Sequence, residues 1–164
     1  MKTPMHFKVT RSQTFQRGVG LIEVLVAVLI LALGLLGMAG LQANALKTNQ
    51  SSYGRTQAVM LSYYMLDAMR ADRNNAALQN YNTGAIAGGV IEPACSANVF
   101  NQPNLLDNTR KDWLESLKFA LGNADSTCGA IHCEVTGECT IQITWDDSRA
   151  GGSGQQRLET RSRL

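Results

Sequence analysis

An uncharged apolar segment near the N-terminus constrains this chain more than any other feature. Residues 24–41 contain no charged side chain, and the residue just before them is Glu23. An α-helix rises 1.5 Å per residue, so a helix over residues 24–46 covers roughly 35 Å, enough to cross the hydrocarbon core of a bilayer. The sequence therefore predicts a membrane-spanning helix that carries a carboxylate at its N-terminal end.

The charges in front of this segment indicate its orientation. Residues 1–18 contain no acidic residue, and their basic or partly basic residues are Lys2, His6, Lys8, Arg11 and Arg17. Positive charges stay on the cytoplasmic side of a membrane, so we expect the C-terminal part of the chain on the opposite side. The formal net charge of the chain is +2. Without residues 1–18, 11 basic residues face 13 acidic ones, so nucleic acid is not an expected partner.

Two ordinary explanations of the apolar segment remain open. A secretory signal peptide is one, because Ala43-Asn44-Ala45 is a usable small-x-small cleavage site. That explanation would leave a secreted, soluble, disulfide-stapled domain, but the apolar run is longer than the usual 7–15 residues. A plain single-span anchor is the other explanation. It accounts for the length and the basic residues, but it gives no reason for Glu23, and ionisable groups near lipid usually have a function.

The residues around Glu23 resemble the processing site of type IV prepilins. The stretch Gly18-Val19-Gly20-Leu21-Ile22-Glu23 ends a basic leader with glycine and places glutamate fifth after it. The resemblance implies that a prepilin peptidase/methyltransferase cuts between Gly18 and Val19 and methylates the new N-terminus at Val19. Phenylalanine or methionine is commoner than valine there, so slower processing is expected at worst.

The same resemblance gives Glu23 a role in assembly. It implies that Glu23 neutralises an N-terminal amine, its own or that of a neighbouring subunit, and so sets the axial register between subunits. An amine or a carboxylate is costly alone near lipid, and the two are tolerable as a pair. The predicted organisation is a cleaved leader over residues 1–18, a transmembrane and assembly helix over 19–46, and a periplasmic pilin-like globular domain over 47–164.

The helix is expected to continue beyond the membrane. Apolar residues recur with a period near 3.6 through residues 53–69, which predicts one helix from about residue 19 to residue 78, ending near Asn74-Asn75. The methionines and aromatic residues at 60–69 are expected in the core. Gly34, Gly37 and Gly40 indicate either close helix packing or a helix that softens locally.

The remaining segments predict a small mixed domain. Residues 79–103 are expected to form a connecting loop, and residues 108–121 an amphipathic helix capped by Asn108 or Thr109, with Trp113 in the core. Alternation predicts strands in residues 131–147, with a turn at Thr136-Gly137, and a last strand at 155–164 after a glycine-rich loop. The exposed face of that last strand is predicted to carry Arg157, Glu159, Arg161 and Arg163. The fold class is α+β and pilin-like, a long N-terminal helix packed against a small C-terminal antiparallel sheet.

Four cysteines follow the apolar segment, and they are Cys95, Cys128, Cys133 and Cys139. In an oxidising compartment an even number in a small domain predicts two disulfides, and the sequence alone does not choose among three connectivities. Our working hypothesis joins Cys133 to Cys139 across the hairpin and Cys95 to Cys128. The spacing lacks the C-x2-C pattern of zinc sites, so no metal and no cofactor is expected.

A narrower resemblance concerns function. GRTQAVMLSYYMLDAMRADRNNA, the tryptophan helix and CTIQITWDD before a glycine-rich loop are similar to PilV-type minor pilins. This implies a structural subunit in the inner membrane that works in pilus assembly with other minor pilins and the major pilin. A pseudopilin of type II secretion is the first alternative. A DNA-binding minor pilin of competence, using Arg157, Arg161 and Arg163, is the second.

Catalysis is not expected of this chain. His132 is the one histidine after Gly18, and no G-x-S-x-G element is present in the sequence. The acidic pair Asp146-Asp147 is predicted to start a turn rather than to line a cleft.

Overall fold

The computed structural model describes residues 18–87 and 90–164. The predicted leader therefore lies outside the described residues, except for Gly18. The chain divides into two compact units, Met1–Leu41 and Gln42–Leu164, and each is described by itself.

The first unit consists of the N-terminal part of helix α1 (Leu21–Ala71) and the three residues before it. Every described side chain up to Leu41 is exposed. The helix is long and apolar enough to cross a membrane, a statement about its length and composition, which a signal sequence can also satisfy.

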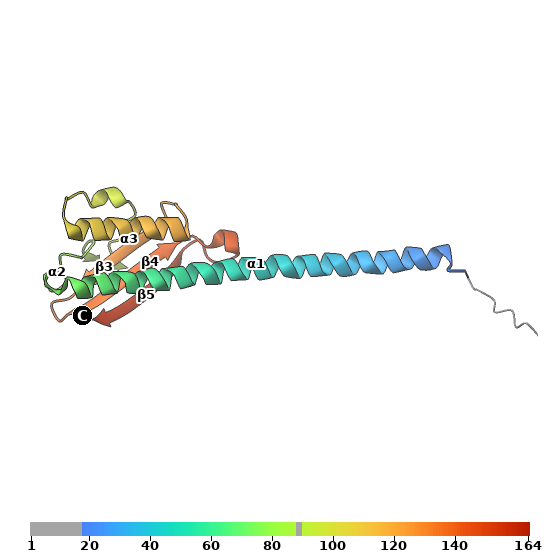
Figure 1. Ribbon diagram of the computed structural model, residues 1–164, viewed down its shortest axis with the longest axis horizontal. Coiled ribbons are helices and arrows are strands. Elements are labelled where there is room, and N and C mark those ends of the chain that lie inside the picture. The colour runs from blue at the N-terminus through green and yellow to red at the C-terminus, as the bar shows by residue number, and fades with distance from the viewer. Residues whose placement is uncertain (1–17, 88–89) are drawn as a thin grey trace, which may run out of the picture. The chain divides into compact units, whose positions relative to one another are not determined.

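The second unit is a two-layer α+β structure, which confirms the predicted fold class (Figure 1). Strands β3 (Cys128–Cys133), β4 (Glu138–Trp145) and β5 (Gln156–Arg163) form an antiparallel sheet in the order β3-β4-β5. Helix α3 (Leu105–Leu121) and the part of α1 from residue 42 onward cover one face of this sheet.

The core of the second unit lies between the two helices and the sheet. Its fully buried large side chains include Met65, Leu66, Met69, Trp113, Leu114, Leu117, Ile131, Ile141 and Ile143. Trp113 joins the layers, because its indole N–H donates to the carbonyl of Leu61 at 3.0 Å. A Cβ at Gly129 would lie 2.5 Å from the Trp113 ring, so β3 needs glycine at that point. The prediction of Trp113 as a core residue is confirmed.

The predicted helix over 19–78 is wrong at its C-terminal end. Helix α1 ends at Ala71, and a separate short helix α2 (Arg73–Ala77) follows. The break falls at Asp72, whose φ of −119° and ψ of 55° are not helical. The Asp72 carboxylate accepts a hydrogen bond from the side-chain amide of Asn75 at 2.8 Å, a contact that spans the first turn of α2.

Helix α3 begins earlier than predicted. Asn104 caps it, accepting the backbone N–H of Asp107 at 2.7 Å with its side-chain oxygen. The predicted caps, Asn108 and Thr109, therefore lie inside the helix. Asparagine is a strong N-cap, and Asn104 supplies the acceptor that an initial turn needs.

The prediction of a buried methionine and aromatic stripe is only partly right. Met65 and Met69 are fully buried, but Met60, Tyr63 and Tyr64 are 58%, 54% and 50% exposed. The reason is geometric, because only one stripe of a helix can face a sheet, and the tyrosines lie on other faces of α1.

The loops contain more structure than expected. Residues 79–103 include strands β1 (Ile86–Ala87) and β2 (Val90–Ile91) and the 3-10 helix η1 (Ala97–Val99). The glycine-rich loop after β4 contains a second 3-10 helix, η2 (Ser148–Ala150).

The turn between β3 and β4 includes the predicted Thr136-Gly137 pair. Gly137 has a φ of +82°, a conformation that favours glycine. The turn is closed by the backbone N–H of Glu134, which donates a hydrogen bond to the carbonyl of Glu138 at 2.8 Å. The last strand begins at Gln156, and its four charged residues are exposed as predicted.

Candidate processing and assembly site

The first turn of α1 brings Gly20 and Glu23 together. The carbonyl of Gly20 accepts the backbone N–H of Glu23 at 2.9 Å and that of Val24 at 3.3 Å. Glu23 is the acidic residue of this first turn. A negative charge at a helix N-terminus is favourable, because the helix dipole is positive there. The Glu23 carboxylate therefore does not destabilise the start of the helix, even without an ion-pair partner.

Gly18 is not required by the fold of the chain. A Cβ placed on it would have no atom within 4 Å, and its φ lies outside the left-handed region. Residues 18–20 have no regular secondary structure. A requirement for glycine at position 18 would therefore come from a molecule that binds this segment, as a peptidase does.

The surroundings of Glu23 are apolar and open. Val19, Leu21 and Ile22 are exposed large hydrophobic residues. Among the ion pairs of residues 18–87 and 90–164, none involves Glu23. Its carboxylate is available to an amine, including one that cleavage would create at Val19.

No contact within the chain requires glycine at the three glycine positions further along α1. A Cβ on Gly34, Gly37 or Gly40 would meet nothing within 4 Å. Each glycine in a helix interior costs about 1 kcal/mol relative to alanine. The three glycines thus weaken the helix without easing any contact inside this subunit.

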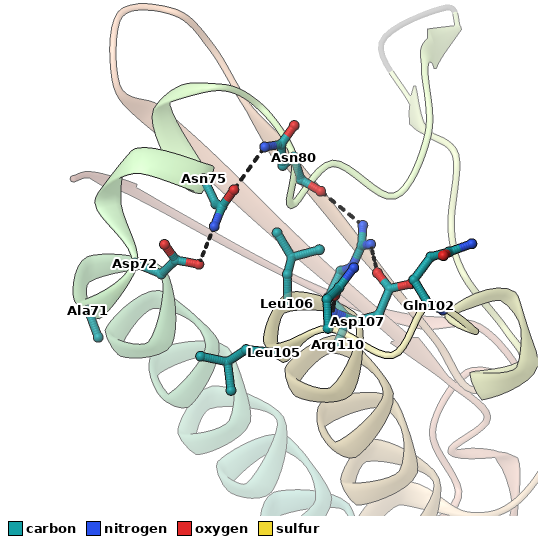
Figure 2. Close-up of a pocket in the computed structure, with 10 residues that line it drawn as sticks. Ala71, Asp72, Asn75, Asn80, Gln102, Leu105, Leu106, Asp107 and Arg110 are labelled. Atoms are coloured by element: carbon teal, nitrogen blue, oxygen red, sulfur yellow. Dashed lines mark hydrogen bonds and ion pairs between the residues drawn. The ribbon is translucent and has the colours of Figure 1, made fainter.

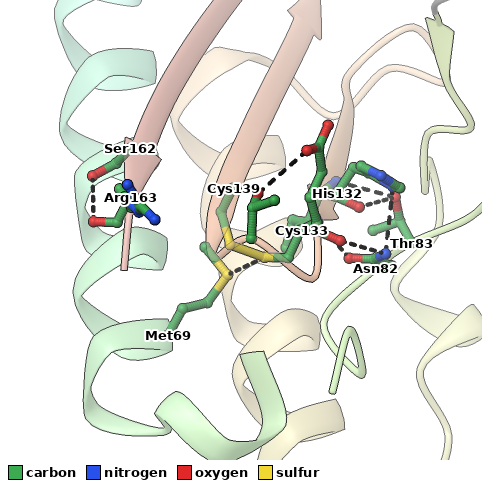
Figure 3. The surroundings of a disulfide bond; sticks show 11 residues. Met69, Asn82, Thr83, His132, Cys133, Cys139, Ser162 and Arg163 are labelled. Carbon is green, nitrogen blue, oxygen red and sulfur yellow. Dashed lines mark hydrogen bonds between the residues drawn. A yellow bond between two sulfur atoms is a disulfide. The ribbon is translucent and has the colours of Figure 1, made fainter. Parts of the chain in front are cut away.

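Two disulfide bonds cross-link the second unit. Cys95 joins Cys128 with a Cα–Cα distance of 4.2 Å, and Cys133 joins Cys139 with a Cα–Cα distance of 4.0 Å. These are the pairs of the working hypothesis. The Cys133–Cys139 bond lies at the hairpin end of β3 and β4, where Sγ of Cys133 is 3.8 Å from Sδ of Met69 (Figure 3).

A polar pocket of about 600 Å³ lies beside the start of α3 (Figure 2). Arg110 forms an ion pair with Asp107, donates to the carbonyl of Asn80 at 3.1 Å and lies 4.6 Å from the centre of the Phe100 ring. Burial alone would raise the pKa of Asp107, but hydrogen bonds from Arg110 and from the Gln102 N–H hold that pKa below its usual range. This ion pair was not predicted, although the i,i+3 spacing of Asp107 and Arg110 is visible in the sequence.

The arginines of β5 are partly neutralised. Glu159 forms ion pairs with Arg157 at 3.1 Å and with Arg161 at 2.7 Å. The hydrogen bond from Arg161 lowers the pKa of Glu159, so this carboxylate stays charged. Two of the three arginines that the DNA-binding alternative needs are therefore engaged with one carboxylate.

No group of three or more histidine, cysteine, aspartate or glutamate residues that could hold a metal ion occurs in the described part of the chain.

Comparison with known proteins adds one match. A family model described as "Prokaryotic N-terminal methylation motif" matches residues 14–39, which include Gly18, Val19 and Glu23. No curated protein matches the chain, and no solved structure does. The matched segment extends to residue 39, within the exposed apolar part of α1. The chain thus carries a prokaryotic N-terminal methylation motif.

Proposed function

We propose that the protein is a minor pilin of the type IV pilus system. It is made as a prepilin in the inner membrane, cut between Gly18 and Val19, and methylated at Val19 by the same peptidase. It acts by packing as a structural subunit, without catalysis, beside other minor pilins and the major pilin in pilus assembly.

The observation that carries this proposal is the placement of Gly18 just before an exposed apolar helix and of Glu23 in the first turn of that helix. Gly18 has no structural reason to be glycine, and Glu23 has no ion-pair partner in the described residues. Both features make sense when a peptidase recognises the glycine and an amine pairs with the glutamate. The methylation motif supports the same interpretation.

The second unit supports a periplasmic location. Its two disulfides suit an oxidising compartment. The positive charges of residues 1–18 favour the opposite side of the membrane for the N-terminus. A pseudopilin of type II secretion would share the motif. Deletion of the gene distinguishes the two functions. Loss of pili supports the minor pilin, whereas loss of secretion with normal pili supports the pseudopilin.

Substitution of Glu23 tests the assembly role. Glu23→Val removes the partner of the Val19 amine but leaves the apolar helix intact, so membrane insertion and cleavage should persist while incorporation into pili falls. The measurement compares the protein in membranes with the protein in sheared pili. Lys47→Val, which removes an exposed charge further along α1, is the control and should assemble normally. Normal incorporation of the Glu23→Val variant into pili would contradict a role of Glu23 in assembly.

A further inference from the structure

The two edges of the three-stranded sheet differ in how their backbone groups are paired. Strand β3 forms one edge and β5 the other (Figure 1). The segment that precedes α3 runs beside β3 and bonds the backbone groups that point away from β4 (Figure 3). The bonded pairs are Gly129 with Ala94, Ile131 with Thr83, and Cys133 with Asn82. The chain therefore satisfies the β3 edge by itself.

Strand β5 has no such neighbour on its outer side. In an antiparallel pair, residues alternate between those that bond the partner strand and those that point away from it. The backbone N–H of Leu164 donates to the carbonyl of Gly137 at 2.9 Å, and the register continues one to one from there along β5. The residues of β5 that point away from β4 are therefore Arg157, Glu159, Arg161 and Arg163.

The N–H and C=O groups of these four residues form a free edge, which we call the β5 edge. Among the hydrogen bonds of residues 18–87 and 90–164, only the Ser162 hydroxyl reaches one of these groups, the Arg163 carbonyl at 3.4 Å. All four residues are exposed. The strand has eight residues, without a proline or a bulge. A regular edge of this length is a template for one more strand.

An apolar strip of α1 lies beside the β5 edge. Two side-chain hydrogen bonds join α1 to β5, and they are Ser62 to Thr160 at 3.0 Å and Arg70 to Ser162 at 2.9 Å. Tyr63 and Val59 precede Arg70 by about two and three helical turns, so they lie on the same side of α1. Val59 is half-buried, and Tyr63 is 54% exposed. The inward side chains of an added strand would lie against this strip, so they should be apolar.

The charges of β5 oppose pairing with a second copy of the chain. Two β5 strands that pair antiparallel with their charged residues aligned place Arg157 of each copy opposite Arg163 of the other. Like charges directly opposite each other destabilise a sheet, and charged edge residues protect proteins against such self-association. A strand that fits this edge therefore belongs to a different protein, and its outward residues are acidic or uncharged.

We propose that an extended strand of a different pilin subunit adds to the β5 edge, with apolar residues on Tyr63 and acidic or uncharged residues beside the arginines of β5. The proposal deepens the proposed function and rests on it, because neighbouring pilin subunits supply the strand. In such a contact the main-chain hydrogen bonds give affinity, and the alternate side chains give specificity.

Photocrosslinking of the full-length chain in membranes tests this contact. A photocrosslinking phenylalanine derivative replaces Tyr63 in cells that make all the pilus subunits. We expect an adduct with another pilin subunit, which maps to a segment that alternates apolar and polar residues. The same derivative at Val135, which is 84% exposed in the β3–β4 turn, is the control and should give no adduct with that segment.

Two substitutions at one position separate the backbone from the side chain. Arg161→Pro and Arg161→Ala both remove the arginine side chain, but only proline removes the N–H. That N–H points away from β4, so proline is compatible with the β4–β5 pairing. Arg161→Pro should reduce the adduct at least about tenfold, because the added strand loses a hydrogen bond and meets the proline ring. Arg161→Ala should change it by less than about twofold.

Folding of the variants is checked by denaturant unfolding in detergent, where both should have the same midpoint. If Arg161→Pro unfolds earlier, hydrogen exchange of the unsubstituted protein decides instead. The outward amides of β5 should exchange rapidly in the purified protein and slowly in the crosslinked adduct. Equal exchange rates in the two samples would overturn the strand addition.

Four crosslinking results would also overturn it. They are the absence of an adduct from position 63, an adduct only with a second copy or with a protein that is not a pilin, an adduct that Arg161→Pro leaves unchanged, and an equal loss with Arg161→Ala. The N-terminal residue of the protein is determined in the same samples. A mature Val19 terminus without the adduct rejects the strand addition alone, whereas an unprocessed N-terminus rejects the proposed function.

Discussion

Glycine and glutamate act in different ways at the start of α1. Glu23 belongs to the first turn of the helix, where its charge suits the dipole. Gly18 precedes the helix and has free space around its Cα. The fold therefore does not require glycine there, and in the proposed function Gly18 matters for recognition by the peptidase, which substitution can test.

The Gly18→Val variant should insert into the membrane with unchanged folding but keep its leader. A branched side chain at position 18 meets no atom of this chain, but it would obstruct an enzyme that needs close approach to the backbone. Gly20→Ala is the matched control, since its Cβ would make only an ordinary contact with Ile22 at 3.9 Å. Electrophoretic size of the membrane form measures cleavage. Complete cleavage of Gly18→Val contradicts the assignment of the processing site.

The buried ion pair of Asp107 and Arg110 should make a pH-dependent contribution to stability. Asp107→Asn leaves Arg110 without its carboxylate, and removing one partner of a buried pair costs about 3 kcal/mol. The pKa of Asp107 is lowered in the folded protein from 3.8, so the unfolded state binds more protons near that pH. The stabilisation is therefore complete above about pH 5 and is lost as the pH falls through the folded pKa.

Denaturant unfolding of the full-length protein in detergent at pH 7 and pH 3 measures this contribution. The exposed pair Asp67 and Arg70 has the same i,i+3 spacing, so Asp67→Asn is the control and should cost at most about 0.5 kcal/mol. Equal losses for the two variants at pH 7 would show that burial of the Asp107 pair contributes nothing extra.

At the scale of elements, glycines on a helix and on a strand should respond in opposite directions to the same substitution. A Cβ at Gly54 of α1 would make ordinary contacts of 3.8 Å with Leu121 and Trp145, whereas one at Gly129 of β3 would overlap the Trp113 ring. Gly54→Ala should raise the free energy of unfolding by about 0.5–1 kcal/mol, because alanine is the better helix former. Gly129→Ala should lower it by about 1–3 kcal/mol. The same sign for both variants in denaturant unfolding contradicts the packing described around Trp113.

The elements differ in how well the sequence predicts them. The apolar period of α1 and the alternation of β4 and β5 extend over many residues, so the fold class followed from pattern alone. The end of α1 did not, because it falls at the non-helical backbone of Asp72, where the sequence has no glycine or proline to mark a break. Strands β1 and β2 are two residues long, which is too short to show an alternation of apolar and polar residues. Asn104 is a residue type that favours the N-cap, but the predicted caps, Asn108 and Thr109, lie four and five residues later.

The candidate sites show the same difference. Gly18, Val19 and Glu23 are close in sequence, so a motif can identify them. A shallow pocket between α1 and α3, by contrast, is lined by residues more than fifty positions apart, such as Gln57 and Phe119. Only the packing of α3 beside α1, fixed by the Trp113 hydrogen bond to Leu61, brings them together.

For the whole molecule, the two units divide the work of the proposed function. The first unit is an exposed apolar helix with a charged residue in its first turn, suited to lipid and to neighbouring helices. The second is an α+β unit cross-linked by two disulfides, which in the proposed function would contact the partner subunits. Processing links them, because cleavage after Gly18 creates the amine that Glu23 is proposed to neutralise.

The mass and N-terminal residue of the mature protein, purified from membranes, test this account most directly. The account predicts a chain that begins with singly methylated Val19 and lacks residues 1–18. A chain that begins at Leu46, after Ala43-Asn44-Ala45, would contradict it and indicate ordinary secretion of the second unit. An intact N-terminus at residue 1 would contradict it as well and indicate a plain membrane anchor.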